Sequence, residues 1–171
     1  MSALTLSTEH GEVVIRLLEE QAPASVAHIR ALVEQLAGAD GCFYRAQRRE
    51  HWLPGRQFEI VQGGWPLMSD LPCVDHEVAT LPHRRGTVSL ARGEPGTATG
   101  EFFVCLDEDA PALDQGAPSP MDGHGFSVFG QVVDGMDVLE RIHSMPTDPE
   151  HPEGMLRGQL LLEPVTFRAS I

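Results

Sequence analysis

Positive charge is scarce in this sequence. Its 171 residues include 12 basic side chains, all of them arginine, against 25 acidic ones, so the formal net charge is −13. Nucleic-acid binding depends on clustered lysine and arginine, and we therefore expect no nucleic-acid partner. One short basic cluster, interrupted by Glu50, is interpreted as a solvated loop; its members are Arg45, Arg48, Arg49 and Arg56.

Cysteine is also rare. Cys42, Cys73 and Cys105 are an odd number of residues without CxxC spacing, which argues against structural disulfides and a thiolate metal site. The run Asp75-His76-Glu77 is followed by Thr80 at the position where the HExxH zinc motif has its second histidine. A metal-dependent enzyme is therefore an alternative that lacks its motif, and we expect no metal and no cofactor.

Long apolar runs are absent as well. No stretch approaches the roughly 18 apolar residues of a membrane-spanning helix, and the first ten residues lack the basic and apolar segments of a secretory signal. We therefore expect no membrane partner and a cytoplasmic location. The hydrophobic fraction of 42% and the charged fraction of 22% are typical of a soluble globular protein. We expect a single domain over residues 1–171 and, because no pattern indicates an interface, a monomer.

Apolar periodicity predicts two helices. Pro23 fits the first turn of a helix, apolar residues recur at helical spacing as far as Leu36, and Gly38 follows as a stop signal. A second helix is expected after Asp134, a candidate N-cap, and should end before Pro146.

Short β-like runs account for most of the remaining apolar residues. They are a hairpin within 2–18 and six further runs at 42–46, 58–62, 87–92, 102–106, 126–133 and 160–167. Eight strands in a twisted sheet can close into a small barrel that is filled by side chains. We therefore predict a mostly β protein, a closed eight-stranded antiparallel β-barrel capped by two α-helices.

Three groups of motifs occur in a fixed order along the chain. Phe43-Tyr44-Arg45 precedes Val61-Gln62-Gly63-Gly64, a glycine-rich segment runs from Gly86 to Phe103, and Met121-Asp122-Gly123 precedes Phe129-Gly130. Over most of the chain this ordered set resembles the cyclophilins, a family of peptidyl-prolyl cis/trans isomerases. The resemblance implies the same capped barrel and an enzyme that accelerates rotation about X-Pro bonds, assists protein folding and needs no cofactor. Its implied partners are proline-containing peptides and unfolded polypeptides.

Prolyl isomerisation breaks no covalent bond, so it needs neither a nucleophile nor a metal. Its barrier of about 18–20 kcal/mol arises from amide resonance. As the C–N bond twists, the prolyl nitrogen regains its lone pair, and a donor held beside it stabilises the twisted state. The resemblance implies Arg45 as this donor, and Gln62 as the glutamine that binds the substrate backbone and helps to place Arg45.

A proline pocket and a peptide groove are also implied. Phe103 matches the floor of the pocket, while strand alternation directs Phe102 into the barrel. Ala91 and Arg92 would offer backbone groups to an extended peptide, as in strand addition. The complete set expected to bind substrate is Phe58, Ile60, Ala91, Arg92, Glu101, Phe103, Met121, His124 and Phe126.

The sequence departs from the family pattern around this pocket. Arg45 and Gln62 are 17 positions apart, about twice the usual separation. The aligned residues before Gln62 are Glu59 and Ile60 in place of phenylalanine and methionine, so Phe58 could supply the missing aromatic ring.

Further departures lie later in the chain. Glu101 stands where the family usually has glutamine, and it could pair with Arg45 or Arg92. Met121 stands for the leucine of the family's Trp-Leu-Asp-Gly, with Pro120 in place of the tryptophan, and His124 is a displaced candidate for the pocket histidine.

These departures leave an alternative within the same fold, a catalytically weak or inactive module that binds proline-containing peptides. A lipocalin-type barrel also fits the strand count. It would need a roomy apolar interior, and it gives no reason for the glycine-rich segment that ends at Phe103.

Overall fold

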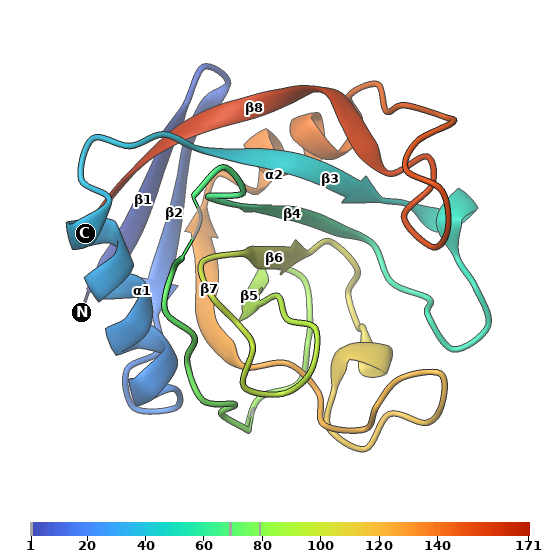
Figure 1. The fold of residues 1–171 in the computed structure, drawn as a ribbon, viewed down its shortest axis with the longest axis horizontal. Coiled ribbons are helices and arrows are strands. Elements are labelled where there is room, and N and C mark those ends of the chain that lie inside the picture. Colours follow the sequence, from blue (N-terminus) through green and yellow to red (C-terminus); the bar gives the residue numbers. More distant parts are fainter. Residues whose placement is uncertain (1, 69, 79) are drawn as a thin grey trace.

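The computed structural model describes residues 2–68, 70–78 and 80–171. Its regular structure consists of eight strands, two α-helices and two short 3₁₀ helices, and Figure 1 shows their arrangement. The strands are β1 Ala3–Thr8, β2 Gly11–Leu17, β3 Gly41–Gln47, β4 Ile60–Gly64, β5 Thr87–Leu90, β6 Phe102–Cys105, β7 Val128–Asp134 and β8 Leu160–Ser170, the helices are α1 Pro23–Gln35 and α2 Met136–His143, and two short 3₁₀ helices are η1 Arg49–His51 and η2 Pro111–Leu113.

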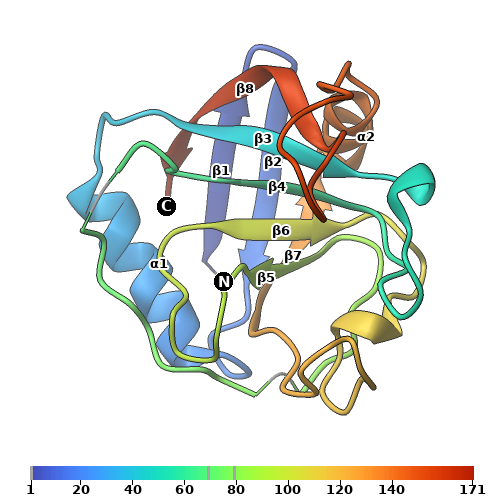
Figure 2. The same cartoon turned by 45° about the vertical axis from the view of Figure 1, so that its right-hand side comes forward.

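The strands form a closed antiparallel barrel in the order β1-β2-β7-β5-β6-β4-β3-β8. The long strand β8 closes it, because its C-terminal part pairs with β1 and its preceding part pairs with β3. Figure 2 shows these strands wrapping around a common interior. The predicted closed eight-stranded barrel with two helices is therefore confirmed.

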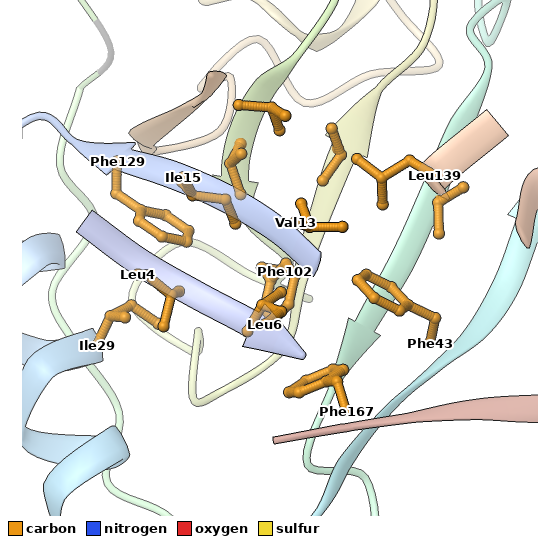
Figure 3. Close-up of a cluster of buried hydrophobic side chains, with 14 of the residues drawn as sticks. Leu4, Leu6, Val13, Ile15, Ile29, Phe43, Phe102, Phe129, Leu139 and Phe167 are labelled. Carbon is orange, nitrogen blue, oxygen red and sulfur yellow. The ribbon is translucent and has the colours of Figure 1, made fainter. Parts of the chain in front are cut away.

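Strand alternation explains how the interior is filled. In the hairpin of β1 and β2, Leu4 pairs with Ile15 and Leu6 pairs with Val13, and all four side chains are fully buried. Four phenylalanine rings pack at the centre with centroids 5.2–6.5 Å apart (Figure 3); they are Phe43, Phe102, Phe129 and Phe167. Side chains occupy the space that a lipocalin-type barrel would keep for a ligand, so that alternative does not apply.

Both helices contribute to this interior cluster, through Ile29 of α1 and Leu139 of α2 among others. Neither these helices nor any other in the part of the chain that the structure describes has the length and apolarity needed to cross a membrane.

The first turn of α1 is capped by a distant residue. The Glu77 carboxylate accepts hydrogen bonds from the backbone N–H groups of Ala24 and Ser25, at 3.0 and 2.8 Å, and this satisfies donors that have no partner within the helix.

The start of α2 corrects the expected cap. Gly135, not Asp134, is the N-cap residue, and Asp134 is the last residue of β7. Gly135 has φ 87°, and a Cβ there would lie 2.2 Å from the carbonyl oxygen of Glu12. The left-handed backbone and this close approach both require glycine. Asp134 accepts a hydrogen bond from the N–H of Gly135 instead.

Three long loops gather on one side of the barrel, at the right of Figures 1 and 2. They are the segments 48–59, 106–127 and 144–159, which follow β3, β6 and α2. The first two loops are in contact at Gly55 and Pro120, which lie so close together that a Cβ on Gly55 would be 2.4 Å from the Pro120 ring. The same side of the barrel carries the residues of the candidate site.

Candidate active site

One row of paired residues crosses the outer face of four strands. Arg45 of β3 pairs with Gln62 of β4, Gln62 pairs with Phe103 of β6, and Phe103 pairs with Ser89 of β5. Paired residues of neighbouring strands point to the same face of a sheet. The barrel therefore brings Arg45, Gln62 and Phe103 together although they are far apart in the sequence.

A β-bulge at Tyr44 puts Arg45 into this row. Phe43 pairs with Gly63 of the antiparallel strand β4. Arg45 is two residues further along β3, yet it pairs with Gln62, which is only one residue from Gly63, so the register shifts by one between Phe43 and Arg45. Phe43 points into the barrel and is fully buried. Without the shift Arg45 would pair with Val61, which is also buried inside, and the arginine would face the core.

Three carboxamide oxygens hold the Arg45 guanidinium. Nε donates to Gln159 at 2.9 Å, Nη1 donates to Gln62 at 2.6 Å and Nη2 donates to Gln47 at 2.7 Å. No carboxylate of the described residues forms an ion pair with Arg45. Burial lowers the pKa of Arg45 to about 10, so it stays charged at neutral pH. The site thus fixes the guanidinium without neutralising it.

A chain of hydrogen bonds continues from Gln62 to Glu101. The Gln62 amide donates to the Tyr44 hydroxyl at 2.7 Å, and this hydroxyl donates to the Glu101 carboxylate at 2.9 Å. Its direction follows from its two ends, because arginine can only donate and an ionised carboxylate can only accept. Burial and the neighbouring Glu101 raise the pKa of Tyr44, which keeps the hydroxyl proton in place. Glu101 could have paired with Arg45 or Arg92, but in the structure it accepts from Tyr44 and Arg92 pairs with Asp122.

Beside this row lies a small cavity of about 130 Å³. Its lining combines apolar and cationic side chains: Arg45, Arg56, Phe58, Ile60, Gln62, Ala91, Arg92, Phe103, Leu113 and Phe126. Sites for drug-sized ligands have volumes of roughly 300–1,000 Å³. This cavity is smaller and suits one side chain, such as a proline ring, rather than a whole peptide.

The inserted segment between β3 and β4 positions Phe58. The carbonyl of Phe58 accepts hydrogen bonds from the Gln47 amide at 3.0 Å and from the Trp52 indole at 3.1 Å. The Phe58 side chain is buried and packs in a second apolar cluster with Ile60 and Phe103. Gln47 thereby links the backbone of the insertion directly to the guanidinium of Arg45.

Phe103 rests on a buried histidine. The ring of His83 stacks with Phe103 at a centroid distance of 6.0 Å, and its Nδ1 and Nε2 lie 2.7 Å from Asp114 and from Ser89 Oγ. Burial lowers the pKa of His83, although Asp114 opposes the shift. Ser89 is fully buried, so this Ser-His-Asp row supports the floor of the cavity and presents no nucleophile to a substrate.

Arg92 is fixed by the loop before β7. Its guanidinium pairs with Asp122 at 2.7 Å, donates to the carbonyl of Gly125 and lies 4.6 Å from the ring centroid of Phe126. The Arg92 hydrogen bond lowers the pKa of Asp122 to about 2. These contacts place Arg92 and Phe126 together at the rim of the cavity.

Eight of the eleven predicted site residues line the cavity, and Glu101, Met121 and His124 do not. Glu101 lies behind Gln62, as described above. Met121 packs at the edge of the second apolar cluster. The His124 ring lies against His76, whose Nε2 is 3.1 Å from the His124 carbonyl oxygen.

Sequence reasoning missed several residues of the site. Leu113 lines the cavity, whereas Met121, which was expected there, does not. Leu113-Asp114 is itself a Leu-Asp pair upstream of Met121-Asp122, and this signal could have identified it. No local signal indicated the roles of Gln47 and Gln159, because only the folded barrel brings them to Arg45.

The basic cluster is not a solvated loop. Arg45 and Arg56 line the cavity, while Arg48 donates to the carbonyl oxygens of His143 and Met145, at 2.7 and 2.5 Å, around the end of α2. Of the four arginines, Arg49 has the mostly exposed side chain, 75%, and lies over the Trp52 ring.

The histidines and carboxylates considered for a metal have other contacts. Glu77 caps α1, and His83 bonds Asp114 and Ser89. Over residues 2–68, 70–78 and 80–171, no three His, Cys, Asp or Glu side chains form a group that could hold a metal ion.

Known proteins share this fold. The sequence model of the cyclophilin type peptidyl-prolyl cis-trans isomerase/CLD family matches residues 3–157. Comparison with curated proteins found no significant match. Among solved structures, the cyclophilin type peptidyl-prolyl cis-trans isomerase of Cryptosporidium parvum, crystallised in the presence of the dipeptide Ala-Pro, has a TM-score of 0.74 and 20% identity, with 98% of this chain and 96% of that chain covered. A cyclophilin from Hirschia baltica has a TM-score of 0.64 and 23% identity, with 95% and 72% covered.

The closed eight-stranded barrel with its two helices is the fold of the cyclophilins. The chain belongs to the family of cyclophilin type peptidyl-prolyl cis-trans isomerases, since the family model matches most of its length. Its activity is accordingly the cis/trans isomerisation of X-Pro bonds.

Proposed function

We propose that Arg45 is the catalytic donor of this isomerase and that the cavity beside it receives the proline ring. One observation carries the proposal: the guanidinium is held by three neutral amide oxygens at the edge of a small cavity that is partly lined by apolar side chains and suits one side chain. Amides restrain the guanidinium as carboxylates would, but they leave its charge uncompensated. That charge is then available to a group that gains electron density during the reaction.

In this mechanism the ring of the substrate proline packs on Phe103, with Phe58 and Ile60 beside it. Burial of the ring fixes the prolyl side of the peptide bond while the other side rotates. As the bond twists, the nitrogen lone pair forms and accepts a hydrogen bond from Arg45. The planar states have no such lone pair, so the interaction favours the twisted state and lowers the barrier.

Gln62 and Glu101 act at different distances from the substrate. Gln62 faces the cavity and holds Nη1 of Arg45, so it orients the guanidinium. Tyr44 and Glu101 hold the Gln62 amide from behind and act only through it. Ala91 and Arg92 line the neighbouring rim, where their backbone can pair with an extended peptide.

The substrates we propose are flexible or unfolded polypeptides that contain proline, which the protein would isomerise in the cytoplasm as a monomer during folding. The Cryptosporidium parvum structure supports the substrate class, because that relative was crystallised in the presence of Ala-Pro. The small cavity also supports it, since one proline ring fills the space and leaves the rest of the chain outside. We propose no cofactor, because the reaction needs only a positioned donor.

The deciding experiment is two-dimensional NMR exchange on a short peptide with one Xaa-Pro bond, using wild type, Arg45→Ala and Arg49→Ala. Uncatalysed exchange takes tens of seconds or longer, so catalysis is easily detected. We expect wild type and Arg49→Ala to accelerate exchange, because the Arg49 side chain is mostly exposed and lies outside the cavity lining. Arg45→Ala should lose most of the acceleration.

Two other outcomes would contradict the proposal. Acceleration that survives in Arg45→Ala would remove Arg45 from the mechanism. Line broadening of the peptide without accelerated exchange in wild type would show that the protein is a proline-peptide binding module instead.

A further inference from the structure

The cavity is cationic in a strongly acidic protein. Three of the ten lining residues are arginines, Arg45, Arg56 and Arg92, and none is an aspartate or glutamate. The whole chain has only 12 basic residues and a formal net charge of −13. A quarter of its cations therefore surround one cavity of about 130 Å³.

Among the residues that the structure describes, two of these three guanidinium groups lack a counter-charge. Arg45 bonds three amides, as described above, and Arg92 pairs with Asp122. Arg56 makes neither an ion pair nor a side-chain hydrogen bond with any residue of the described ranges. Arg45 and Arg56 line the same cavity of about 130 Å³, so their like charges repel each other. Like charges held together without a carboxylate are unfavourable unless an anion joins them.

The third guanidinium, that of Arg92, already has a counter-charge. Its side chain is only 4% exposed and pairs with Asp122. Its Nε is buried and has no hydrogen-bond partner in the described part of the chain. The cavity thus presents two cations, Arg45 and Arg56, for which the described residues supply no counter-charge.

We propose that this cavity selects substrates that carry an acidic residue next to the proline, whose carboxylate pairs with Arg56. The inference rests on the proposed function, because it assumes that the proline ring occupies the cavity. Arg56 belongs to the inserted segment between β3 and β4, so it adds a specificity site to the barrel without altering the row from Arg45 to Phe103. A carboxylate beside Arg56 would also relieve its repulsion with Arg45.

The proposal is tested with peptides of identical composition. In one peptide glutamate stands next to the single proline, and in its isomer the same glutamate stands several residues away; one such pair is made for each side of the proline. Because net charge is the same within a pair, long-range repulsion by the acidic protein cancels. The value of kcat/KM is measured by NMR exchange relative to the uncatalysed rate of each peptide. A partly buried ion pair should favour the adjacent isomer by about threefold to tenfold on at least one side.

Two variants assign the effect. Arg56→Gln should reduce the ratio between isomers to about one. Arg49→Gln is the matched control, since it removes one arginine from the same segment but from outside the cavity lining. It should retain the wild-type ratio.

The outcomes separate this inference from the proposed function. Equal rates for the isomers on both sides of the proline, or a preference that persists in Arg56→Gln, overturn the inference and leave the isomerase mechanism intact. Absence of turnover with every peptide overturns the proposed function and the inference with it. A preference lost in Arg56→Gln and kept in Arg49→Gln establishes the acidic-residue specificity.

Discussion

Removing the Tyr44 hydroxyl should impair catalysis although this group lies behind Gln62. In Tyr44→Phe the Gln62 amide loses the acceptor at 2.7 Å and the Glu101 carboxylate loses its donor at 2.9 Å. The Gln62 carboxamide is then free to rotate away from Nη1 of Arg45. The guanidinium would keep its contacts with Gln47 and Gln159, so we expect a partial rather than a complete loss of activity.

The magnitude follows from the two hydrogen bonds. Each contributes about 0.5–1.5 kcal/mol net, and a buried group left unpaired costs about 1–3 kcal/mol. We therefore expect Tyr44→Phe to lower the free energy of unfolding by about 1–3 kcal/mol. If the transition state loses about 1 kcal/mol of this stabilisation, because Gln62 no longer holds Arg45 in place, kcat/KM falls by about fivefold. In Glu101→Gln the side chain can still accept a hydrogen bond from Tyr44, but its amide can also donate, so the direction of the hydrogen bonds is no longer defined. Its loss of kcat/KM should therefore be smaller than that of Tyr44→Phe.

The assay is NMR exchange on one Xaa-Pro peptide, combined with urea denaturation so that turnover is compared only between fully folded proteins. Thr8→Val is the matched control, because the Thr8 hydroxyl also makes two hydrogen bonds, to Gly11 and His10, in the β1–β2 turn far from the site. It should lower stability and leave turnover unchanged. The side-chain amide resonances of Gln62 should shift in Tyr44→Phe and not in Thr8→Val. Wild-type turnover in Tyr44→Phe, together with a measured loss of stability, would refute the positioning role.

Three more predictions concern Arg45, the cap of α1 and the buried His83. Arg45→Lys should lower kcat/KM by about 100-fold or more, since an ammonium group cannot donate in a fixed fork to three amides and still face the substrate; near-normal turnover in this variant would contradict the mechanism. Glu77→Ala should cost about 0.5–2 kcal/mol in urea denaturation, because the first turn of α1 loses its cap, with turnover unchanged. Burial depresses the pKa of His83 below its ordinary 6.5. As pH falls through 6.5, His83 therefore binds a proton in the unfolded chain before it does so in the folded protein, and the free energy of unfolding decreases. Denaturation midpoints measured above and below pH 6.5 should show a weaker acid loss in His83→Gln than in wild type, and equal losses would exclude His83 as the cause.

Local sequence patterns were sufficient for most of the architecture. Period-2 alternation correctly directed Phe102 into the barrel and Phe103 to its outer face, since the two belong to the interior and the outer cluster respectively. Helical periodicity after Pro23 likewise located α1. These features depend on the repeat of the backbone itself, which the sequence displays directly.

Only the tertiary structure decided how the site is assembled. The bulge at Tyr44 depends on pairing with β4 and β8, and a one-residue shift of register has no signature in the sequence of a single strand. Gln159 reaches Arg45 from 114 positions away, and Leu113 rather than Met121 lines the cavity because of the path taken by a long loop. Such contacts depend on barrel closure and loop packing, which join residues that no local pattern connects. The sequence alone therefore determined the barrel and the identity of Arg45 and Gln62 as candidates, whereas closure of the barrel determined which neighbours hold them in place.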